Sequence, residues 1–354
     1  MIQYPPSGAG LLSPLNMSKK KKAFVTGITG QDGSYLAELL LEKNYEIYGL
    51  LRRNSNPSYG NVAHLRQNIN FIFGDLADPA CLSMYLAKIR PDEIYNLGAQ
   101  SHVHESWLQP LATADQTGLG AIRIFEAVRN IVPQARVYQA STSELFGETK
   151  ITPQNEDTPI NPANPYAASK ALAHFDARIY RNSFQLFIST GIMFNHESPR
   201  RSPDFVTRKI SLAVAAIKLG LKGHRIPLGQ GGRPVVNPEG KLELGNLDAK
   251  RDWGFAGDYV EAMWMILQHS VPDDFVVATG EVRTVADLCE AAFSVVGLNW
   301  KDYVVVNPEW IRPTETGPLV GDFSKIKKTL GWQPKTDFKK LIEMMVTSDL
   351  ARLS

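Results

Sequence analysis

A tyrosine and a lysine are spaced for joint acid–base chemistry in the run Asn164-Pro165-Tyr166-Ala-Ala-Ser-Lys170. Asn164 is a suitable N-cap and Pro165 a suitable first helical residue, so Tyr166 and Lys170 are expected one turn apart on one face of a helix. A nearby ammonium stabilises a phenolate and lowers the pKa of the tyrosine, which would let Tyr166 take the proton of an alcohol during oxidation. The same spacing occurs on ordinary exposed helices, so its meaning depends on the rest of the chain.

A carboxylate precedes this helix, in the Ala-Ser-Thr-Ser-Glu run at residues 140–144. The run follows an apolar stretch typical of a strand, and ligands of open α/β sheets bind at the carboxyl ends of strands. There Glu144 could remove a carbon-bound proton beside a newly formed carbonyl group and return a proton to a departing hydroxyl, which is the chemistry of dehydration. The alternative is that Glu144 is the N3 carboxylate of a capping box beginning at Ser141. We favour the catalytic interpretation because Tyr166 and Lys170 follow.

Three glycines, Gly27, Gly30 and Gly33, form the pattern G-x-x-G-x-x-G between a predicted strand at residues 23–26 and a predicted helix at residues 35–43. Glycine permits a tight turn and a close backbone approach, and the helix N-terminus offers free N–H groups and a positive dipole end to a pyrophosphate. The pattern alone also fits an ordinary turn. The flanking strand and helix favour a dinucleotide site.

The residues after the second predicted strand distinguish NAD from NADP. An acidic residue about 20 positions beyond the glycines would bind the ribose diol of NAD, but the chain has Arg52 and Arg53. Guanidinium groups suit a 2′-phosphate, so we predict NADP; the alternative is a solvated basic turn. Asp75, Leu97 and Ala99, after the third and fourth strands, are expected to line the adenine and ribose pocket.

Short apolar runs alternate with amphipathic helical patterns in the first half of the chain. Strands are predicted at residues 23–26, 46–51, 70–73, 93–97, 136–140 and 187–194, and helices at residues 35–43, 82–89, 118–130 and 166–182. This βαβα order predicts an α/β fold with a Rossmann-type, doubly wound parallel sheet. We assign residues 21–194, with contributions from about 245–270, to an NADP-binding domain.

After residue 194 the rhythm changes, with turns rich in Pro and Gly and a segment at residues 230–241 that looks like an inserted hairpin. Helices are predicted at residues 258–268, 285–296, 322–330 and 338–348, and short strands near Phe275 and Val304. We therefore expect residues 195–354 to form mainly a smaller C-terminal α/β lobe that binds substrate over the carboxyl edge of the sheet. Residues 1–20, rich in Pro, Gly and Ser, are expected to be a disordered leader.

Composition argues against several classes of protein. The 354 residues include 38 Lys plus Arg and 36 Asp plus Glu, so net charge gives no reason to expect nucleic acid or a membrane surface as partner. No apolar run reaches the ~20 residues that span a bilayer. The two cysteines, Cys81 and Cys289, have no paired spacing. They predict neither a disulfide framework nor a metal site, which fits a reducing, cytoplasmic setting.

Together these features resemble the extended short-chain dehydrogenase/reductase family. The Ser-Thr-Ser-Glu-Leu run at residues 141–145, with Tyr166 and Lys170, resembles the nucleotide-sugar 4,6-dehydratases of that family. A finer resemblance, to the GDP-mannose 4,6-dehydratase family, extends from about Lys22 to the C-terminus. It rests on the runs at residues 26–36, 51–53, 194–201, 205–209 and 244–253.

The resemblance implies a reaction without net redox change, in a homodimer or homotetramer. NADP would take hydride from C4 of GDP-mannose and return it to C6 after water has left across C5 and C6, giving GDP-4-keto-6-deoxymannose. The implied catalytic residues are Thr142, Ser143, Glu144, Tyr166 and Lys170, with Thr142 polarising the C4 oxygen.

The expected ligand contacts form two groups. Those predicted for NADP are Gly27, Thr29, Gly30, Gln31, Asp32, Gly33, Arg52, Arg53, Asp75, Leu76, Leu97, Ala99, Tyr166, Lys170, Asn195, His196 and Arg201. Those predicted for the GDP-sugar are Ser101, Glu144, Asn195, Lys209, Leu244, Asn246, Arg251, Arg312 and Glu315. Arginine and lysine are also the residue types that a diphosphate requires.

Three features depart from the family pattern. Phe146 stands where tyrosine is usual, residues 230–241 look inserted, and the run 101–107 is atypical. In that run His102 and His104 could contact substrate, although single histidines are more often structural or solvated. These departures leave a related GDP-sugar, such as a GDP-heptose, as an alternative substrate.

Two other functions stay open. An epimerase or reductase of nucleotide sugars would use Tyr166 and Lys170 but has no evident need for Glu144. A non-catalytic sugar-nucleotide sensor would retain the fold alone, since a fold does not dictate a function.

Overall fold

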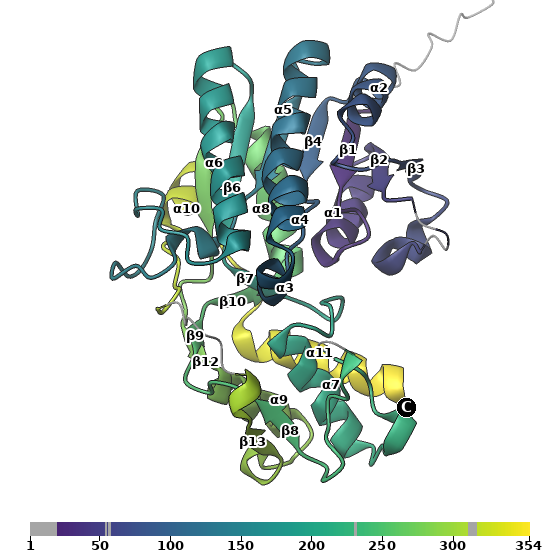
Figure 1. Ribbon diagram of the computed structural model, residues 1–354, viewed down its shortest axis with the longest axis vertical. Helices are drawn as coiled ribbons and strands as arrows, with labels where there is room; N and C mark the ends of the chain where they lie inside the picture. The colour runs from purple at the N-terminus through teal and green to yellow at the C-terminus, as the bar shows by residue number, and fades with distance from the viewer. Residues whose placement is uncertain (1–19, 54, 56–57, 230–231, 311–316) are drawn as a thin grey trace, which may run out of the picture.

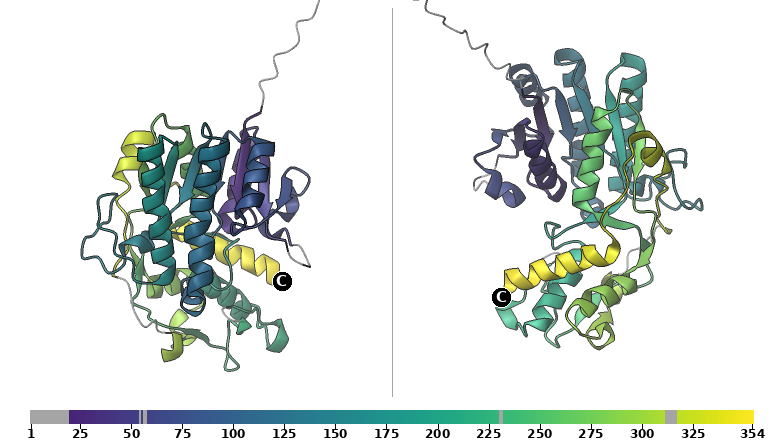
Figure 2. Two further views of the ribbon diagram at one scale, coloured as in Figure 1. Left: turned by 45° about the horizontal axis from the view of Figure 1, so that its top comes forward. Right: turned by 180° about the vertical axis from the view of Figure 1, so that it is seen from behind.

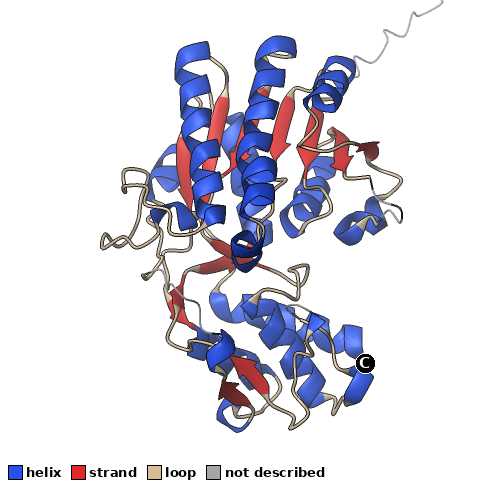
Figure 3. Ribbon diagram, viewed as in Figure 1, coloured by secondary structure: helices blue, strands red, loops and turns tan. Residues whose placement is uncertain are grey.

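A seven-stranded parallel sheet forms the larger part of the molecule (Figures 1 and 3). The structure is a computed structural model that describes residues 20–53, 55, 58–229, 232–310 and 317–354. The strand order is β11-β6-β5-β4-β1-β2-β3, and each neighbouring pair is parallel. The strands are β1 (Lys22–Thr26), β2 (Glu46–Leu51), β3 (Asn70–Phe73), β4 (Glu93–Asn96), β5 (Arg136–Ala140), β6 (Ile188–Met193) and β11 (Asp274–Val277).

Two layers of helices cover the sheet, because alternate strand residues point to opposite faces. One core lies between the sheet and α1 (Gln31–Glu42), α8 (Ala256–Gln268) and α10 (Ser324–Leu330), and it contains Val25, Leu40, Met263, Phe275 and Ile326. The other lies between the sheet and α2 (Pro79–Ile89), α5 (Gly120–Ile131) and α6 (Pro165–Phe184), and it contains Phe24, Leu86, Phe125, Val137 and Ala177. Burial on both faces explains why apolar residues predominate in most of these strands.

Short helical segments occupy the connections at the carboxyl edge of the sheet. They are η1 (Gly60–Leu65) after β2, then α3 (Val103–Leu108), α4 (Pro110–Thr113) and η2 (Ala114–Leu119) after β4, and η3 (Ser143–Phe146) after β5. The π-helical turn η2 continues directly into α5, so the helix predicted from residue 118 begins at Gly120.

A smaller lobe lies beyond the carboxyl edge of the sheet, in the lower half of Figure 1 and again in both views of Figure 2. It contains α7 (Val206–Lys218), η4 (Gly223–Arg225), β8 (Leu242–Leu244), α9 (Val285–Val295), η6 (Trp300–Asp302), β13 (Val304–Val306), η7 (Pro308–Trp310) and α11 (Phe338–Leu353). Strands β8 and β13 pair in parallel. The core of the lobe includes Ile210, Leu242, Phe293, Leu341 and Met345.

Two small ladders lie where the sheet and the lobe meet. Strand β7 (Asn195–Glu197) pairs in parallel with β10 (Trp253–Phe255), and β9 (Lys250–Arg251) pairs antiparallel with β12 (Arg283–Thr284). The chain enters the lobe at α7 and returns to the sheet at α8 and β11. It enters the lobe again at α9, returns at α10 and ends in the lobe at α11.

The predicted α/β fold, with a Rossmann-type doubly wound sheet and a smaller lobe, is confirmed with two corrections. The helix predicted for the lobe at residues 322–330 is α10, which packs against the large sheet. The strand predicted for the lobe near Phe275 is β11, which pairs with β6 as an edge strand of the large sheet. All four of its residues are buried, and periodicity does not show which sheet a short buried strand joins. The strand predicted near Val304 is β13, inside the lobe.

Three further sequence expectations concern segments outside this core. Among the residues that the structure describes, no helix is long and apolar enough to cross a membrane. Of the predicted leader at residues 1–20, residues 1–19 lie outside the described part of the chain. In the segment predicted to be inserted, Gln230 and Gly231 also lie outside it, and a bridge pairs Leu228 with Pro234 in antiparallel orientation beside them.

Candidate active site

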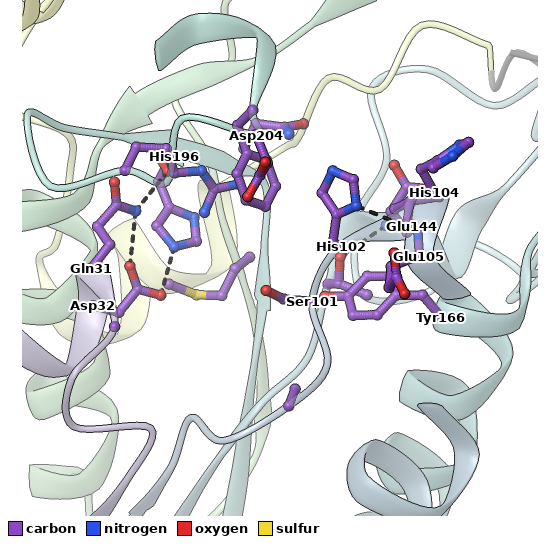
Figure 4. A pocket seen from close by; sticks show the side chains of 18 of the residues that line it. Gln31, Asp32, Ser101, His102, His104, Glu105, Glu144, Tyr166, His196 and Asp204 are labelled. Carbon is purple, nitrogen blue, oxygen red and sulfur yellow. Dashed lines mark hydrogen bonds and ion pairs between the residues drawn. The ribbon is translucent and has the colours of Figure 1, made fainter. Parts of the chain in front are cut away.

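A cavity of about 1320 Å³ lies between the carboxyl edge of the sheet and the lobe. The ends of β1, β4 and β5 line one side of it, and α7, β8 and η7 line the other. Pockets for one ligand typically measure ~300–1,000 Å³, so this cavity is large enough for a dinucleotide and a second ligand. Figure 4 shows Asp32 and His196 on one side of the cavity and Glu144 and Tyr166 on the other.

The glycine turn after β1 forms an open backbone cradle. Gly27 has φ of +67°, and a Cβ there would lie 2.9 Å from the backbone nitrogen of Gly98. A Cβ on Gly33 would lie 2.4 Å from the carbonyl oxygen of Gly27. Helix α1 begins at Gln31 without a side-chain cap, and its first turn lines the cavity. These residues fit the pyrophosphate of a dinucleotide, which binds at a helix N-terminus.

An ion pair joins this turn to the strand that leads into the lobe. His196 Nε2 on β7 lies 2.8 Å from Asp32 Oδ2, and the imidazole stacks on Tyr259 with ring centroids 4.8 Å apart. Burial acts to raise the pKa of Asp32, but the imidazolium of His196 lowers it to about 2. Burial acts to lower the pKa of His196, but the carboxylate of Asp32 raises it above its ordinary value.

Replacing His196 by Gln is expected to destabilise the fold by on the order of 2 kcal/mol in a limited pH range. The raised pKa of His196 means that its contribution is complete below 6.5 and is lost as pH rises through the folded-state pKa. The lowered pKa of Asp32 means that its contribution is present above 3.8 and is lost as pH falls towards about 2. The difference in Tm between wild type and variant should therefore be largest between pH 3.8 and 6.5. An equal difference at alkaline pH would contradict the prediction.

The two arginines after β2 are placed differently. Both are exposed, but only Arg52 lines the cavity. The predicted cofactor contact of Arg53 is therefore not brought to the cavity. The other residues predicted for this end do line it: Thr29, Gly30, Asp75, Leu76, Leu97 and Ala99.

The turn after β5 places Glu144 in the cavity with 9% of its surface exposed. Thr142 caps η3, its Oγ1 accepting a hydrogen bond from Glu144 N at 3.3 Å. The Glu144 carboxylate accepts a hydrogen bond from Asn164 Nδ2 at 3.0 Å through Oε2. The alternative of a capping box beginning at Ser141 is therefore wrong, because the cap is Thr142 and the carboxylate is turned to Asn164.

Helix α6 starts as predicted. Asn164 Oδ1 accepts a hydrogen bond from Ala167 N at 2.8 Å, and Pro165 is the first helical residue. Tyr166 and Lys170 are buried and line the cavity. Lys170 Nζ lies 6.0 Å from the centroid of the Tyr166 ring and donates a hydrogen bond to Ala140 O at 2.8 Å.

Burial governs the ionisation of this pair. It raises the pKa of Tyr166 to about 12, while a hydrogen bond with Thr142 acts to lower it and the charge of Glu144 to raise it. Burial also lowers the pKa of Lys170 to about 8. The spacing predicted that the lysine would lower the pKa of the tyrosine. Instead, desolvation of the buried phenol is the largest influence on its pKa and raises it.

Asn164 is a site residue that the sequence analysis treated only as a helix cap. One amide oxygen fixes the start of α6, and the amide nitrogen of the same side chain holds Glu144. This single residue therefore sets the relative position of Glu144 and Tyr166. The cap was recognisable from the Asn-Pro pair, but the second contact depends on the tertiary fold.

The lobe side of the cavity brings together the residues predicted for the GDP-sugar. Lys209 on α7 donates a hydrogen bond from Nζ to Glu243 O at 2.7 Å, and burial lowers its pKa to about 8. The lining also contains Ser101, Asn195, Leu244, Asn246 and Arg251. Arg312 and Glu315 lie outside the described residues.

Nearly all predicted site residues that the structure describes therefore share one cavity. The remaining ones that line it are Gln31, Asp32, Ser143, His196 and Arg201. Lining residues that were not predicted include Trp107 on α3, Arg233 near β8 and Trp310 on η7. Neither composition nor spacing identifies these residues, because the tertiary fold brings them to the cavity from separate parts of the chain. In the described part of the chain no group of three or more His, Cys, Asp or Glu side chains could hold a metal ion.

Two curated relatives and a family pattern show what this chain is similar to. The sequence pattern of the GDP-mannose 4,6 dehydratase family matches residues 24–233 and 233–345. GDP-mannose 4,6 dehydratase 1 of Arabidopsis thaliana is 50% identical over 343 residues, which cover 94% of this chain and 90% of that protein. The GDP-mannose 4,6 dehydratase of Homo sapiens is 44% identical over 358 residues, covering 93% of this chain and 91% of that protein.

Solved structures share the fold at lower identity. UDP-glucose 4-epimerase of Thermotoga maritima gives a TM-score of 0.79 at 21% identity, covering 94% of this chain and 100% of that one. The dTDP-glucose 4,6-dehydratase of Bacillus anthracis gives 0.77 at 22% identity, covering 93% and 96%. The sequence matches are more specific than this shared fold. The chain belongs to the GDP-mannose 4,6-dehydratase family.

Proposed function

We propose that this protein is an NADP-dependent hydro-lyase that converts GDP-mannose to GDP-4-keto-6-deoxymannose. The observation that carries the proposal is the presence in one cavity of the Glu144 carboxylate, the Tyr166 phenol and a dinucleotide-binding turn. An epimerase or a reductase uses the Tyr166 and Lys170 pair but has no evident need for the carboxylate, and a sensor needs none of the three. The names of the relatives support GDP-mannose as the substrate.

The first proposed step is oxidation at C4, for which bound NADP supplies the hydride acceptor and, later, the hydride donor. Tyr166 takes the proton of the C4 hydroxyl as the carbonyl forms. Thr142, which hydrogen-bonds with Tyr166, polarises the same oxygen, with Ser143 beside it. Because the pKa of Lys170 is about 8, this lysine is mostly protonated at neutral pH, and its positive charge stabilises the Tyr166 phenolate, the form that can accept the proton.

The second proposed step is elimination by Glu144. The C4 carbonyl acidifies C5, so the carboxylate can remove the C5 proton and then protonate the departing C6 hydroxyl. The C5–H and C6–O bonds break, water leaves and a C5=C6 double bond forms. Hydride then returns to C6 and a proton from solvent is added at C5, which balances the proton that Tyr166 took from the C4 hydroxyl and later releases, so the reaction has no net oxidation. Asn164 holds Oε2 of Glu144, so we assign the proton transfer to Oε1.

The preference for NADP is proposed from Arg52, which lines the dinucleotide end of the cavity. The variant Arg52→Ser is expected to bind NADP about 10- to 100-fold more weakly, because a hydrogen bond to a charged group contributes ~1.5–3 kcal/mol. NAD binding should change far less. Arg53→Ser is the matched control, with a smaller effect, since Arg53 does not line the cavity. Calorimetric titration with both cofactors tests this, and an equal loss for both would contradict it.

Mass spectrometry of the reaction products tests the substrate and the reaction together. The protein is incubated with NADP and, separately, with GDP-mannose, a GDP-heptose, UDP-glucose and dTDP-glucose. We expect GDP-mannose to lose one water most efficiently. A higher kcat/KM for the heptose would assign the related substrate. An isomer of unchanged mass would indicate an epimerase, and binding without turnover would indicate a sensor.

We also propose a homodimer or homotetramer in the cytoplasm. An exposed apolar surface supports self-association, and it consists of Leu111, Leu119, Leu172, Phe175 and Ile179 on α4, η2 and α6. These three elements pack against one another, and a contiguous apolar patch is typical of an interface. Cys81 and Cys289 are both free thiols, which fits a reducing compartment. Light scattering gives the mass that distinguishes dimer from tetramer.

A further inference from the structure

Residues 227–229 and 232–235 form the described part of a hairpin in the lobe. The family matches this chain in two segments that meet at residue 233. Two backbone hydrogen bonds close the hairpin, from Val235 N to Pro227 O at 2.9 Å and from Gly229 N to Arg233 O at 2.8 Å. The two matched segments therefore meet within a hydrogen-bonded turn of the lobe.

The lobe fixes the position of this hairpin. Val235 and Val236 at its end belong to the buried core of the lobe. Gly229 lies against the stem of Lys209, because a Cβ there would be 3.8 Å from Lys209 Cγ. It would also be 3.3 Å from Pro203 O. The hairpin is therefore held by packing, which reduces the entropy that its side chains lose on binding a ligand.

The hairpin brings a second cation to the cavity wall beside Lys209. The guanidinium carbon of Arg233 lies 5.0 Å from the ring centroid of Trp310, and Lys209 Nζ lies 4.1 Å from the same centroid. All three residues line the cavity. The Trp310 indole thus attracts both the Lys209 ammonium and the Arg233 guanidinium, which places the two cations near each other at the cavity wall.

The charged groups around Lys209 and Arg233 favour the binding of an anion between them. Burial is the main reason that the pKa of Lys209 is low, and the charge of Arg233 lowers it further. The cavity-lining carboxylate nearest to Arg233 is that of Glu309, at 3.3 Å, with both side chains mostly exposed. Exposed pairs of this kind contribute little. The two cations repel each other, and an anion bound to both would relieve that repulsion.

A second carboxylate near Lys209 is already engaged elsewhere. Glu243 accepts hydrogen bonds from Asn237 Nδ2 at 3.0 Å and from Asn307 Nδ2 at 2.8 Å. Although Glu243 acts to raise the pKa of Lys209, it does not line the cavity. Among the described residues, the charged side chains that face the ligand at this place are therefore Lys209, Arg233 and Glu309.

We propose that Arg233 and Lys209 together bind the diphosphate of the nucleotide sugar, and that the hairpin adds the Arg233 contact to this chain. The inference rests on the proposed function, which takes a nucleoside diphosphate sugar as substrate. A guanidinium can bind two phosphate oxygens at once, whereas an ammonium acts as a point charge. The pair therefore supplies both orientation and charge.

Calorimetric titration with GDP and with guanosine tests the contact without requiring turnover. Arg233→Ala is expected to bind GDP about tenfold more weakly, because the lost contact is a charge-assisted hydrogen bond. Guanosine, which lacks phosphate, should bind wild type and variant equally. Arg233→Lys should fall between them for GDP. Arg225→Ala is the matched control, since Arg225 is exposed in η4, carries the same charge and does not line the cavity.

Two results would overturn the assignment, once circular dichroism and Tm show that the variant is folded. One is an unchanged affinity of Arg233→Ala for GDP. The other is an equal loss for GDP and guanosine, which would place Arg233 at the base. Failure of the proposed function looks different, because wild type would then bind no GDP or form no dehydrated product. If wild type binds UDP instead, titrations with UDP and uridine decide the role of Arg233 in the same way.

Discussion

The variant Glu144→Gln is expected to lose elimination while it keeps its ligands. Its kcat for the 4-keto-6-deoxy product should fall by about 10²- to 10⁴-fold, the usual contribution of a general acid–base group. The amide has nearly the shape of the carboxylate and can still accept a hydrogen bond from Asn164, which now contacts Glu144 at 3.0 Å. The neutral amide cannot take the C5 proton. Affinities for GDP-mannose and NADP should therefore change little.

Oxidation and elimination can be measured separately in this variant. With GDP-mannose, Glu144→Gln should still reduce NADP, which is followed by the absorbance of the reduced nicotinamide, but should release no dehydrated product. The matched control is Glu148→Gln, because Glu148 is exposed and does not line the cavity. Product formation at the wild-type rate by Glu144→Gln would remove the basis for assigning a dehydratase.

The second large effect is expected from Asp349→Asn, on stability. Arg208 on α7 pairs with Asp349 on α11 at 2.6 Å, and the two side chains are 1% and 0% exposed. Ser211 donates a hydrogen bond to the second oxygen of Asp349 at 2.7 Å. Removing one charge of a buried pair leaves the other uncompensated, which costs ~3–5 kcal/mol. The free energy of unfolding, measured in urea, should fall by about that amount.

Two further variants show whether the lost charge is the cause. The double variant Arg208→Met/Asp349→Leu removes both charges and should recover much of the loss, since apolar replacements of buried pairs are often neutral. Lys340→Ala breaks the exposed pair with Glu343 in α11 and should cost less than about 1 kcal/mol. If Asp349→Asn unfolds at the same urea concentration as wild type, the pair does not hold α7 to α11.

Local patterns in the sequence were sufficient to predict most of the first half of the fold. The glycine turn, the Asn-Pro start of α6 and the alternation of strands and helices all depend on neighbouring residues, and each appears where predicted. Strand β11 was assigned to the lobe, although it pairs with β6 in the large sheet. The pairing of Phe275 with Gly191 joins residues that are far apart in the sequence, so neighbouring residues do not predict it. A four-residue apolar run carries no information about its partner.

The sequence predicted which residues make up the candidate site better than it predicted the contacts between them. Gly27, Glu144 and Tyr166 were identified from motifs, and all three line one cavity. The raised pKa of Tyr166 was not predicted, because it comes from burial that only tertiary packing creates. Arg233 was missed for a related reason. It lies outside the motifs that the sequence analysis used, and the tertiary fold brings it to the wall of the cavity.

The way in which the chain passes back and forth between the sheet and the lobe limits how this enzyme can diversify. The lobe is not one contiguous segment, because its helices α7, α9 and α11 are separated in the chain by α8, β11 and α10, which belong to the sheet. A single recombination event therefore could not exchange the whole lobe. New preferences at the nucleotide end must then arise by local additions between existing elements. The proposed Arg233 contact would be a local change of this kind, because Arg233 lies in the connection between η4 and β8.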